Sequence, residues 1–385
     1  MVMKNCAGKL VLILVLVLLV LAVSGCQAAQ QSAAVAEPAT ATPAPNDAVE
    51  SPADTGKTTT ADPGSTAHPG GSDAPDTAKQ ADGSLSEEPT DSQVDESRPT
   101  GQVTLFISRD FGRQSLIQST ASLADRESVM DLLQSHAQVE TKWDGSFVNS
   151  IEGLKSDSEG LSGNRNDWFF FINGICADVG AAEYFPQSGD MVWWDYHLWG
   201  DMGAMNAAVI GCYPEPFIHG YRGNTGTTTV MSSASNQSLA GKLQAALKSQ
   251  GVKSVTGSLL NNQLLQNRTG PVIALGTWDE LKQLPFLAEL NKAYRKTGLS
   301  VHFTDKGVEL LDGRSRVVNE SGPGTGIIAA TGSGLGDPKV LWLIVGTDEE
   351  GLQSAVDLLV NHPAKIRGFY QAAVISGKAV RLPME

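Results

Sequence analysis

The sequence predicts an α+β domain followed by an α/β open-sheet domain, both placed after a disordered N-terminal tether. Three observations predict this organisation. Residues 27–100 contain no aromatic residue and hold nine of the 18 prolines. Five of the seven tryptophans lie between Trp143 and Trp199. Beyond residue 203, apolar runs alternate with helical patterns, which is typical of an open α/β sheet.

Length and charge exclude several classes of protein. A chain of 385 residues is long enough for two domains of ordinary size. Asp and Glu outnumber Lys and Arg by 42 to 28, a formal charge of −14. This balance excludes a generally basic surface, so we expect no nucleic-acid partner. Four cysteines are too few for a disulfide-built scaffold.

The first 25 residues have the features of a secretion signal. Lys4 and Lys9 precede an apolar run of 14 residues, Leu10 to Val23, whereas a membrane-spanning helix needs about 20. The run ends in Val-Ser-Gly-Cys26, which resembles the bacterial lipobox. The resemblance implies that residues 1–25 are removed and that Cys26 is acylated; the alternative is a coincidental Cys after an ordinary cleavage site. Two or three acyl chains suffice for stable anchoring, so we expect a lipid-anchored protein on the extracytoplasmic face of the cell membrane.

The linker that follows, residues 26–100, is predicted to be disordered. From residue 27 it carries 13 acids and three bases and almost no large aliphatic residue. Such a segment cannot bury enough apolar surface to offset the entropy of ordering. Its 74 residues would span on the order of 50 Å as a random coil. We interpret it as a spacer between the membrane and the folded part.

Residues 101–202 form the first predicted domain. Alternating or apolar runs predict strands at 103–107, Phe147–Ile151, Trp168–Ile172 and Met191–Trp199, and helical spacing predicts a helix at 127–136. Asn173-Gly174 predicts a hairpin turn. Along the last strand, Val192, Trp194, Tyr196 and Leu198 share one face, which we expect to be the core face.

The other face of this strand carries Trp193, Asp195, His197 and Trp199, and Trp168 is a further candidate ligand-binding residue. Three interpretations stay open for this face. It packs against the second domain or a helix, or it is an exposed platform for a ring-shaped or sugar ligand. In the third, His197 is a metal or cobalt axial ligand, although one His and one Asp do not make a ligand set, so we predict no metal site.

The order of these elements resembles the C-terminal domain of transcobalamin and intrinsic factor, which also occurs in bacterial surface lipoproteins. The resemblance covers about 100 residues and depends on the W-x-x-x-x-N-G pattern from Trp168 and the G-D-x-x-x-W pattern from Gly189. It implies a β-grasp-type fold, cobalamin as a ligand and an uptake transporter as a partner. In the vertebrate carriers this domain closes over a corrinoid held against a helical barrel, and no barrel pattern is present in this sequence.

Residues 203–385 form the second predicted domain. The same pattern occurs in two segments, 271–281 and 341–352: a predicted strand is followed by Gly-Thr-x-x-Glu and then by a predicted helix. We interpret Thr277 with Glu280, and Thr347 with Glu350, as capping boxes, because the acids in each first turn would repel a phosphate. A helix at 239–248 and strands near 207–211, 252–259 and 327–331 complete the sheet. This part resembles flavodoxin-like modules of the periplasmic cellulose-synthase regulatory subunit and of surface-layer proteins, and the resemblance implies an extracytoplasmic scaffold.

We recognise no catalytic motif in the sequence, and we predict that the protein is not an enzyme. The favoured function is a membrane-anchored extracytoplasmic binding protein for a small molecule or glycan, with a corrinoid as one candidate. The alternatives are an envelope structural or adhesion protein that contacts wall polysaccharide or another protein, and an extracellular hydrolase. Cys176 and Cys212 are either a disulfide or two buried thiols.

Overall fold

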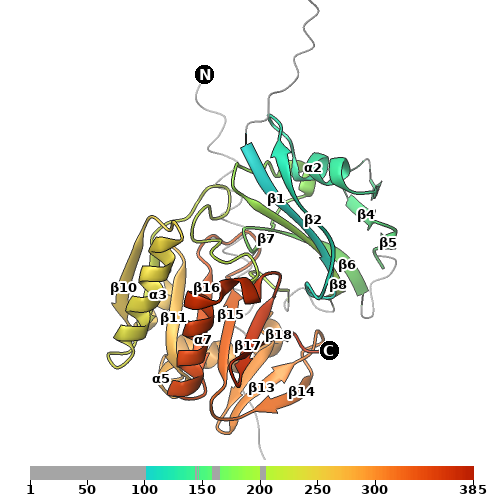
Figure 1. Cartoon of the computed structure of the whole chain (residues 1–385). Helices are drawn as coiled ribbons and strands as arrows, with labels where there is room; N and C mark the ends of the chain where they lie inside the picture. The colour runs from blue at the N-terminus through green and yellow to red at the C-terminus, as the bar shows by residue number, and fades with distance from the viewer. Residues whose placement is uncertain (1–100, 144, 146, 158–164, 200–204) are drawn as a thin grey trace, which may run out of the picture. The chain divides into compact units, whose positions relative to one another are not determined.

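The computed structural model describes residues 101–143, 145, 147–157, 165–199 and 205–385. These residues belong to one compact unit that spans Pro89–Glu385 (Figure 1). The predictions for the signal peptide, Cys26, the tether and the boundary near residue 203 lie outside the described residues. Within the described ranges, no helix is both long and apolar enough to cross a bilayer.

The first sheet has five strands in the order β2-β1-β8-β6-β7. Its strands are β1 (Gly101–Arg109), β2 (Gln114–Leu123), β6 (Arg165–Ile172), β7 (Ile175–Cys176) and β8 (Met191–Trp199). Central β8 runs parallel to β1 and antiparallel to β6. Helix α2 (Val129–His136) and the turn η1 (Ala181–Glu183) lie near one another, and α2 buries Val129, Leu132 and Leu133 in the core of this sheet. A small sheet of β3 (Val139–Lys142), β4 (Phe147–Ile151) and β5 (Leu154–Lys155) lies beside it.

Several predicted elements of this part are confirmed. Strands β4 and β8 have the predicted bounds, and α2 lies within the predicted range. The Asn173-Gly174 turn joins β6 to β7 with positive φ angles of 53° and 80°, as a tight hairpin requires. The predicted fold class, an α+β part followed by an α/β open sheet, is therefore confirmed.

The second sheet has seven strands in the order β10-β9-β11-β16-β15-β17-β18. They are β9 (Thr228–Ser232), β10 (Val255–Leu259), β11 (Val272–Thr277), β15 (Gly326–Thr331), β16 (Leu341–Gly346), β17 (Gln371–Ile375) and β18 (Lys378–Leu382). The first four in spatial order are parallel and the last three continue the sheet in antiparallel pairs. Strands β11 and β16 are buried at every position, as their continuous apolar sequences predict.

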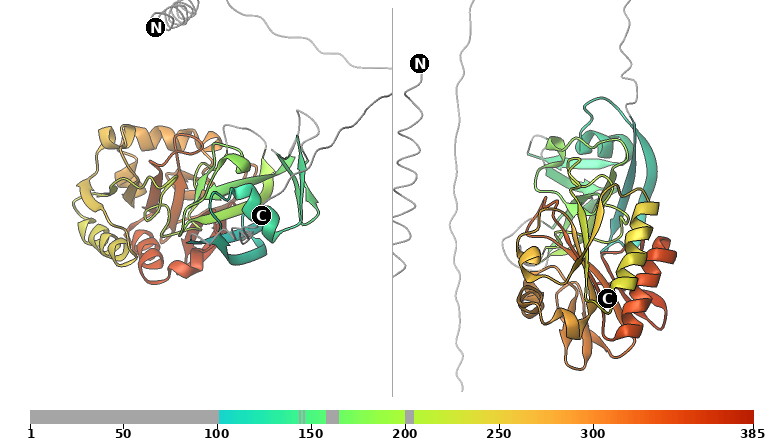
Figure 2. Two further views of the ribbon diagram at one scale, coloured as in Figure 1. Left: turned by 90° about the horizontal axis from the view of Figure 1, so that it is seen from above. Right: turned by 90° about the vertical axis from the view of Figure 1, so that its left-hand side faces the viewer.

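Both faces of the second sheet are covered. Helices α3 (Gln237–Ser249) and α7 (Glu349–Asn361) lie side by side on one face, as the yellow and red helices in Figure 2 show. The other face packs against α6 (Pro285–Lys292) and the meander β12 (Val301–Thr304), β13 (Gly307–Leu311) and β14 (Val317–Ser321). Short helices α4 (Asn262–Gln266) and α5 (Trp278–Leu281) and the turns η3 (Tyr294–Lys296) and η4 (Pro363–Ile366) complete this part.

The segment from 207 to 217 joins the two sheets and is almost entirely buried. The predicted strand at 207–211 is wrong, because these backbone groups pair with two different places, the β6–β7 hairpin and the segment before β17, and form only an isolated bridge at Ala208. Val209 N–H donates to Gly174 O, and Ile210 N–H donates to Tyr370 O. The side chains of Ile210 and Phe217 belong to one apolar core that includes residues of both sheets. The segment is therefore part of the core and no free linker.

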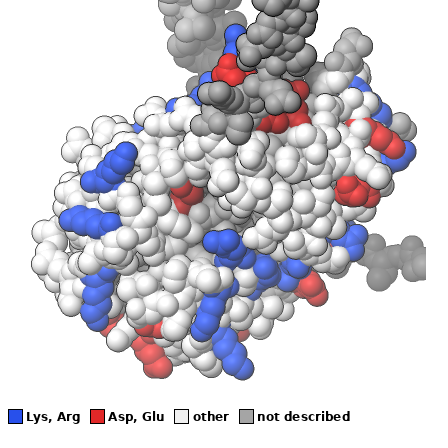
Figure 3. All heavy atoms as spheres, turned by 45° about the horizontal axis from the view of Figure 1, so that its top comes forward, with Lys and Arg blue, Asp and Glu red and all other residues white. Residues whose placement is uncertain are grey.

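Charge is dispersed over the folded part. Residues 101–385 hold 29 acids and 23 bases, a formal charge of −6. On the face in Figure 3, Lys and Arg side chains stand in small groups separated by uncharged surface. This face therefore presents no continuous field of one sign.

Candidate functional site

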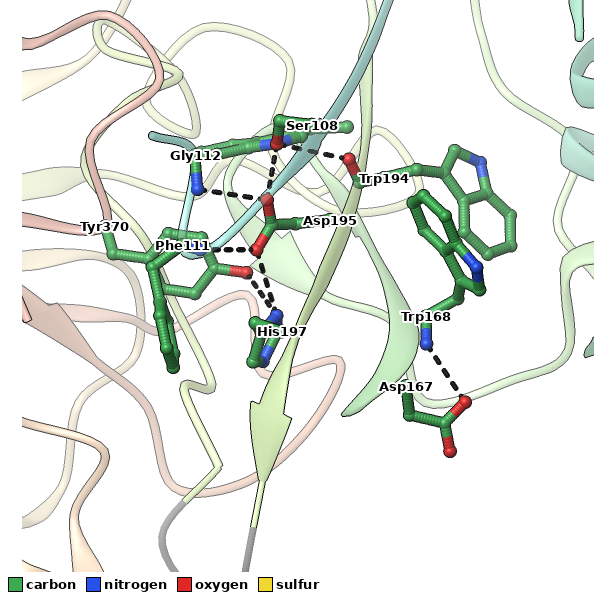
Figure 4. Close-up of polar contacts among 10 residues, drawn as sticks. Ser108, Phe111, Gly112, Asp167, Trp168, Trp194, Asp195, His197 and Tyr370 are labelled. Atoms are coloured by element: carbon green, nitrogen blue, oxygen red, sulfur yellow. Dashed lines mark hydrogen bonds and ion pairs between the residues drawn. The ribbon is translucent and has the colours of Figure 1, made fainter. Parts of the chain in front are cut away.

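The two faces of β8 separate the candidate residues. Trp194 faces the core beneath α2 and stacks on Phe170, with ring centroids 4.9 Å apart. Trp193, Asp195 and His197 lie on the opposite face, toward the second sheet, as the alternation of the strand predicts. Figure 4 shows Asp195 and His197 on one side of the strand and Trp194 on the other.

Trp193 is fully buried, so the interpretation of this face as an exposed platform does not hold at this position. Its ring lies between Phe106, Phe171 and Tyr370, with centroid distances of 5.3, 5.8 and 5.3 Å. Its Nε1–H donates to Ser108 Oγ at 2.7 Å. Burial of so large a ring against the segment before β17 explains the difference, since it removes apolar surface of both sheets from water. Of the three interpretations, packing against the second part of the chain describes Trp193.

Trp168 lies away from the other candidates. Residue 168 pairs with Tyr196, and the two rings pack on the face opposite to His197, 5.2 Å apart. The indole Nε1–H donates to Leu154 O at 3.0 Å. Trp168 is thus a buried core residue, and the candidate ligand-binding role is not supported by its position. Phe169, its neighbour, occupies the face of His197 instead.

Asp195 is a buried carboxylate that accepts hydrogen bonds on both oxygens. Ser108 Oγ (2.5 Å) and Gly112 N–H (3.0 Å) donate to Oδ1, and Phe111 N–H (3.0 Å) donates to Oδ2. The turn between β1 and β2 makes this possible, because Asp110, Phe111 and Gly112 all have positive φ angles of 57°, 58° and 76°. Consecutive left-handed residues direct neighbouring N–H groups to one anion. A bulky residue such as Phe111 rarely adopts this conformation, and here the carboxylate holds it in place.

His197 is held on three sides. Nδ1 lies 3.0 Å from Asp195 Oδ2 and 3.1 Å from the hydroxyl of Tyr370 (Figure 4). Phe111 and Phe169 pack against the imidazole, each with its centroid 4.6 Å away. Burial, followed by the charge of Asp195, raises the pKa of Tyr370 well above its usual range, so the phenol stays protonated. The imidazole therefore has one fixed orientation.

A hollow lies beside the remaining edge of His197. Its cavity volume is about 50 Å³. Trp199 at the end of β8 lines it and is half-buried, with the guanidinium of Arg165 5.3 Å from its ring centroid. The other lining residues are Phe111, Phe169, Phe171, Cys176, Leu198, Met205, Asn206, Gly313 and Ser315. The structure thus brings His197 and Trp199 together at one hollow and leaves Trp193 beneath it.

The geometry gives little support to nucleophilic or metal chemistry at this site. Ser108 binds Asp195 and not His197, so the imidazole is not placed to activate its hydroxyl. Cys176 and Cys212 are buried free thiols, and burial raises the pKa of Cys176 to about 12, which keeps it in the unreactive thiol form. In the described part of the chain, no three His, Cys, Asp or Glu side chains are placed to share a metal ion.

One of the two predicted capping boxes is present. At α5, Thr277 is the N-cap and its N–H donates to Glu280 Oε2 at 2.9 Å. At α7 the prediction of Thr347 with Glu350 is wrong, since Asp348 is the N-cap and accepts from Gly351 N–H at 2.9 Å. Thr347 instead donates to Gly322 O at 3.0 Å, which leaves the next residue free to cap the helix.

These helix ends hold no open anion site. Asn236, which is buried, donates to Glu280 Oε2 at 3.0 Å and to Glu349 Oε1 at 3.3 Å. Carboxylates therefore occupy the N-terminal turns of α5 and α7 and bind the chain itself.

Comparison with known families covers part of the first sheet. Residues 127–198 match a family model. The model describes a domain of unknown function, DUF4430, and this family is broadly similar to transcobalamin. The match includes α2, β6 and most of β8, and therefore includes Asp195 and His197. Among curated proteins, no relative matches the chain.

A corrin macrocycle does not fit this hollow. Pockets for drug-sized ligands have volumes of roughly 300–1,000 Å³. The hollow has a cavity volume of about 50 Å³, well below this range, and the buried ring of Trp193 does not line it. It is too small for a corrin macrocycle, so His197 is not placed to bind the cobalt of a corrinoid there.

Proposed function

We propose that this protein is a lipid-anchored extracytoplasmic binding protein whose ligand occupies the hollow beside His197 and Trp199. The observation that carries the proposal is the environment of His197. Two phenyl rings hold its faces and Asp195 holds Nδ1, while its remaining edge borders empty space. Binding sites need polar side chains fixed in this way by their neighbours, because the ligand then meets a group already in its bound orientation.

The N-terminal sequence supports the location. The lipobox-like Val-Ser-Gly-Cys26 implies an acylated terminus, and the acidic, proline-rich segment after it would space the binding domain from the bilayer. The test is cell fractionation of the full-length protein and of Cys26→Ala. We expect the unchanged protein in the membrane fraction and the variant outside it. Equal membrane retention of both proteins would contradict the anchor.

The binding site is tested by calorimetric titration of the mature chain with neutral sugars, cobinamide and cobalamin. We expect a saturable signal with a small ligand and its loss in Trp199→Ala. Trp143→Phe is the control, since it removes an exposed indole that does not line the hollow. Binding by Trp199→Ala that equals that of the unchanged protein would exclude the hollow as the site, and tight binding of cobinamide would contradict the argument from size.

A second candidate, an envelope structural or adhesion protein, is favoured by the burial of Trp193. Packing of this ring against Tyr370 explains most of the aromatic face without any ligand. Retention of the mature chain on purified cell wall, together with no calorimetric signal for any small molecule, would support this function over the first.

A further inference from the structure

We propose that the free edge of strand β2 pairs with the same edge of a second copy of this chain, antiparallel and about a two-fold axis. The pairing joins two five-stranded sheets into one continuous sheet. It uses a surface separate from the hollow beside His197 and does not depend on the function proposed above. The length of the strand, its lack of charge and its unpaired backbone groups carry the inference.

Strand β2 is long and uncharged for the edge of a sheet. Its ten residues, Gln114–Leu123, include no Asp, Glu, Lys, Arg or Pro. The other edge strands that the structure describes have five residues or fewer. Two of them also carry charges, Lys378 and Arg381 on β18 and Glu140 and Lys142 on β3. Proteins keep sheet edges apart through short strands, charged side chains and proline, and β2 has none of these.

The backbone groups of every second residue of β2 point away from β1. On β1, Thr104 N–H donates to Asp190 O, so the even-numbered residues of β1 are directed toward β8. The odd-numbered residues are therefore directed toward β2, where Leu105 lies opposite Ser119. Directly opposite residues of an antiparallel pair are directed toward one another, and the residues between them point outward. The outward residues of β2 are Gln118, Thr120 and Ser122.

These outward groups are available to a second strand. Among the described residues, no hydrogen bond involves the N–H or C=O groups of Gln118, Thr120 and Ser122 on this side. Their side chains are exposed, whereas Ile117 and Ala121 pack on the core. The irregularity in the pairing with β1 lies at the start of β2, so the strand is regular from Ile117 onward. A second strand can thus extend the sheet without a change in the fold of the chain.

Charge around the strand favours a second copy as the occupant. Residues 109–113, which include two Arg and one Asp, precede β2 with a net charge of +1. Residues 125–127, which are Asp, Arg and Glu, follow it with a net charge of −1. An antiparallel pair about a two-fold axis places the start of each strand beside the end of the other. The flanking charges are then complementary, and the strands themselves bring no like charges together.

The N-terminal segment of the same chain is a poorer partner for this edge. Residues 27–100 hold nine prolines, each of which lacks the N–H that a paired strand donates, and no aromatic residue. They also carry 13 acids. A second β2 is uncharged and already extended, so its backbone loses little further entropy when it pairs.

The direction of the backbone groups also limits the register. Outward residues must lie opposite outward residues, so the two-fold axis passes through a residue position and not between two. The overlap is greatest when this position is Gln118 or Ser119. In both cases the Gln118 side chains of the two copies lie on the same face of the joined sheet, directly opposite or diagonal to one another. A charge introduced at Gln118 therefore meets its own copy.

The experiment is analytical ultracentrifugation of the mature chain that carries Cys26→Ala, a change that removes the terminal thiol and the acyl chains. Because the contact is narrow, we expect a weak monomer–dimer equilibrium at concentrations up to about 0.5 mM. Thr120→Pro should weaken the dimer by about tenfold or more, since it removes one outward N–H from each copy. The hydrogen bonds to β1 do not use this N–H, so thermal unfolding followed by circular dichroism should be unchanged.

A pair of charge variants tests the two-fold axis without removing a backbone group. Gln118→Lys and Gln118→Glu should each weaken the dimer by about threefold or more, because like charges then meet across the axis. An equimolar mixture of the two variants should dimerise at least as strongly as the unchanged chain. Thr256→Lys is the control, since it adds the same charge to an exposed position on β10, another edge strand, and should leave the dimer unchanged.

Three results would overturn the proposal. A monomer throughout the concentration range would exclude a second copy as the occupant of this edge. A dimer that Thr120→Pro and Gln118→Lys leave as strong as before would place the contact elsewhere on the molecule. A mixture of the Gln118 variants that dimerises no better than each variant alone would exclude the two-fold pairing. None of these results bears on ligand binding at the hollow, which the calorimetric titration tests separately.

Discussion

Gly112 shows how closely the turn after β1 approaches the second sheet. Its φ angle is +76°, and a Cβ atom at this position would lie 2.1 Å from Gly368 O and 2.9 Å from the ring of Trp193. Glycine is therefore required for two reasons, the left-handed backbone and the absence of space. The same turn supplies two of the N–H groups that bind Asp195. A change at Gly112 thus acts on the packing of both sheets and on the orientation of His197.

We expect Gly112→Ala to lower the free energy of unfolding by about 2–4 kcal/mol, of which roughly 1–2 kcal/mol is backbone strain and the rest overpacking. Gly153→Ala is the matched control, because its φ angle is +79° but no atom lies within 4 Å of a Cβ there. The free energy of unfolding of Gly153→Ala should fall only by the part that is due to backbone strain. Urea denaturation of both variants measures the difference, and equal losses would contradict a steric role for Gly368.

Part of this site could be predicted from the sequence at the level of residues. The alternation of β8 placed Trp193, Asp195 and His197 on one face, which the structure confirms. The same reasoning applied to β6 would have placed Phe169 opposite Asp195. It could not find Tyr370, because its contact with His197 joins residues 173 positions apart and depends on how the two sheets pack. For the same reason it could not predict that Trp193 is covered.

Helix α2 begins with a capping box whose second member is a carboxylate. The Ser128 side chain accepts from Asp131 N–H at 3.1 Å, and Asp131 Oδ2 accepts from Ser128 N–H at 3.0 Å. Hydrogen bonds from the Ser128 side chain and then its backbone hold the pKa of Asp131 below its ordinary value of 3.8. A carboxyl group with a lowered pKa in the folded state stabilises the fold above its unfolded pKa, and this contribution is lost as pH falls through the folded pKa.

We expect Asp131→Asn to be less stable than the unchanged protein at neutral pH and to approach it as the pH falls below about 3.8. Thermal unfolding followed by circular dichroism across this range measures the difference. Ser128→Ala, which removes the N-cap, should cost about 1 kcal/mol at neutral pH. A stability difference for Asp131→Asn that does not change with pH would show that the charge of this carboxylate plays no part.

Two substitutions test which residue caps helix α7. Asp348 Oδ1 accepts from Gly351 N–H at 2.9 Å, and its Oδ2 accepts from Gly324 N–H at 2.8 Å. We expect Asp348→Ala to lower the free energy of unfolding by about 1–2 kcal/mol, measured by urea denaturation. Glu350→Ala, in the first turn of the same helix, should cost less than about 0.5 kcal/mol. The reverse order would restore the box of Thr347 with Glu350 that the sequence predicted.

Elements were predictable where burial imposes a pattern. Strands β8, β11 and β16 are apolar or alternating and were found from the sequence. Strand β14 was missed, because four of its five residues are exposed and its sequence, Val-Val-Asn-Glu-Ser, has no buried periodicity. Strand β2 was missed for a similar reason, since it is an edge strand and most of its residues are exposed or partly exposed. Such strands form through pairing with a neighbour, which sequence patterns do not report.

At the scale of the whole molecule, the sequence predicted two domains, and the packing couples them. Irregular backbone is rarely buried, because its polar groups then need partners elsewhere in the structure. The segment from 207 to 217 finds them on both sheets, at Gly174 and at Tyr370. Trp193 and Phe171 of the first sheet meet the ring of Tyr370, which precedes β17. Separation of the sheets would therefore expose a large aromatic surface and several unpaired backbone groups.

We expect the mature chain to unfold in one cooperative transition, because neither sheet keeps its core intact without the other. Differential scanning calorimetry tests this expectation through the ratio of the calorimetric to the van't Hoff enthalpy, which should be close to one. Tyr370→Ala is the informative variant, since loss of this ring leaves a cavity beside Trp193 and should cost about 3–5 kcal/mol. Two separated transitions in the unchanged protein, with only the one at lower temperature shifted by Tyr370→Ala, would show instead that the sheets are independent units that meet at a weak interface.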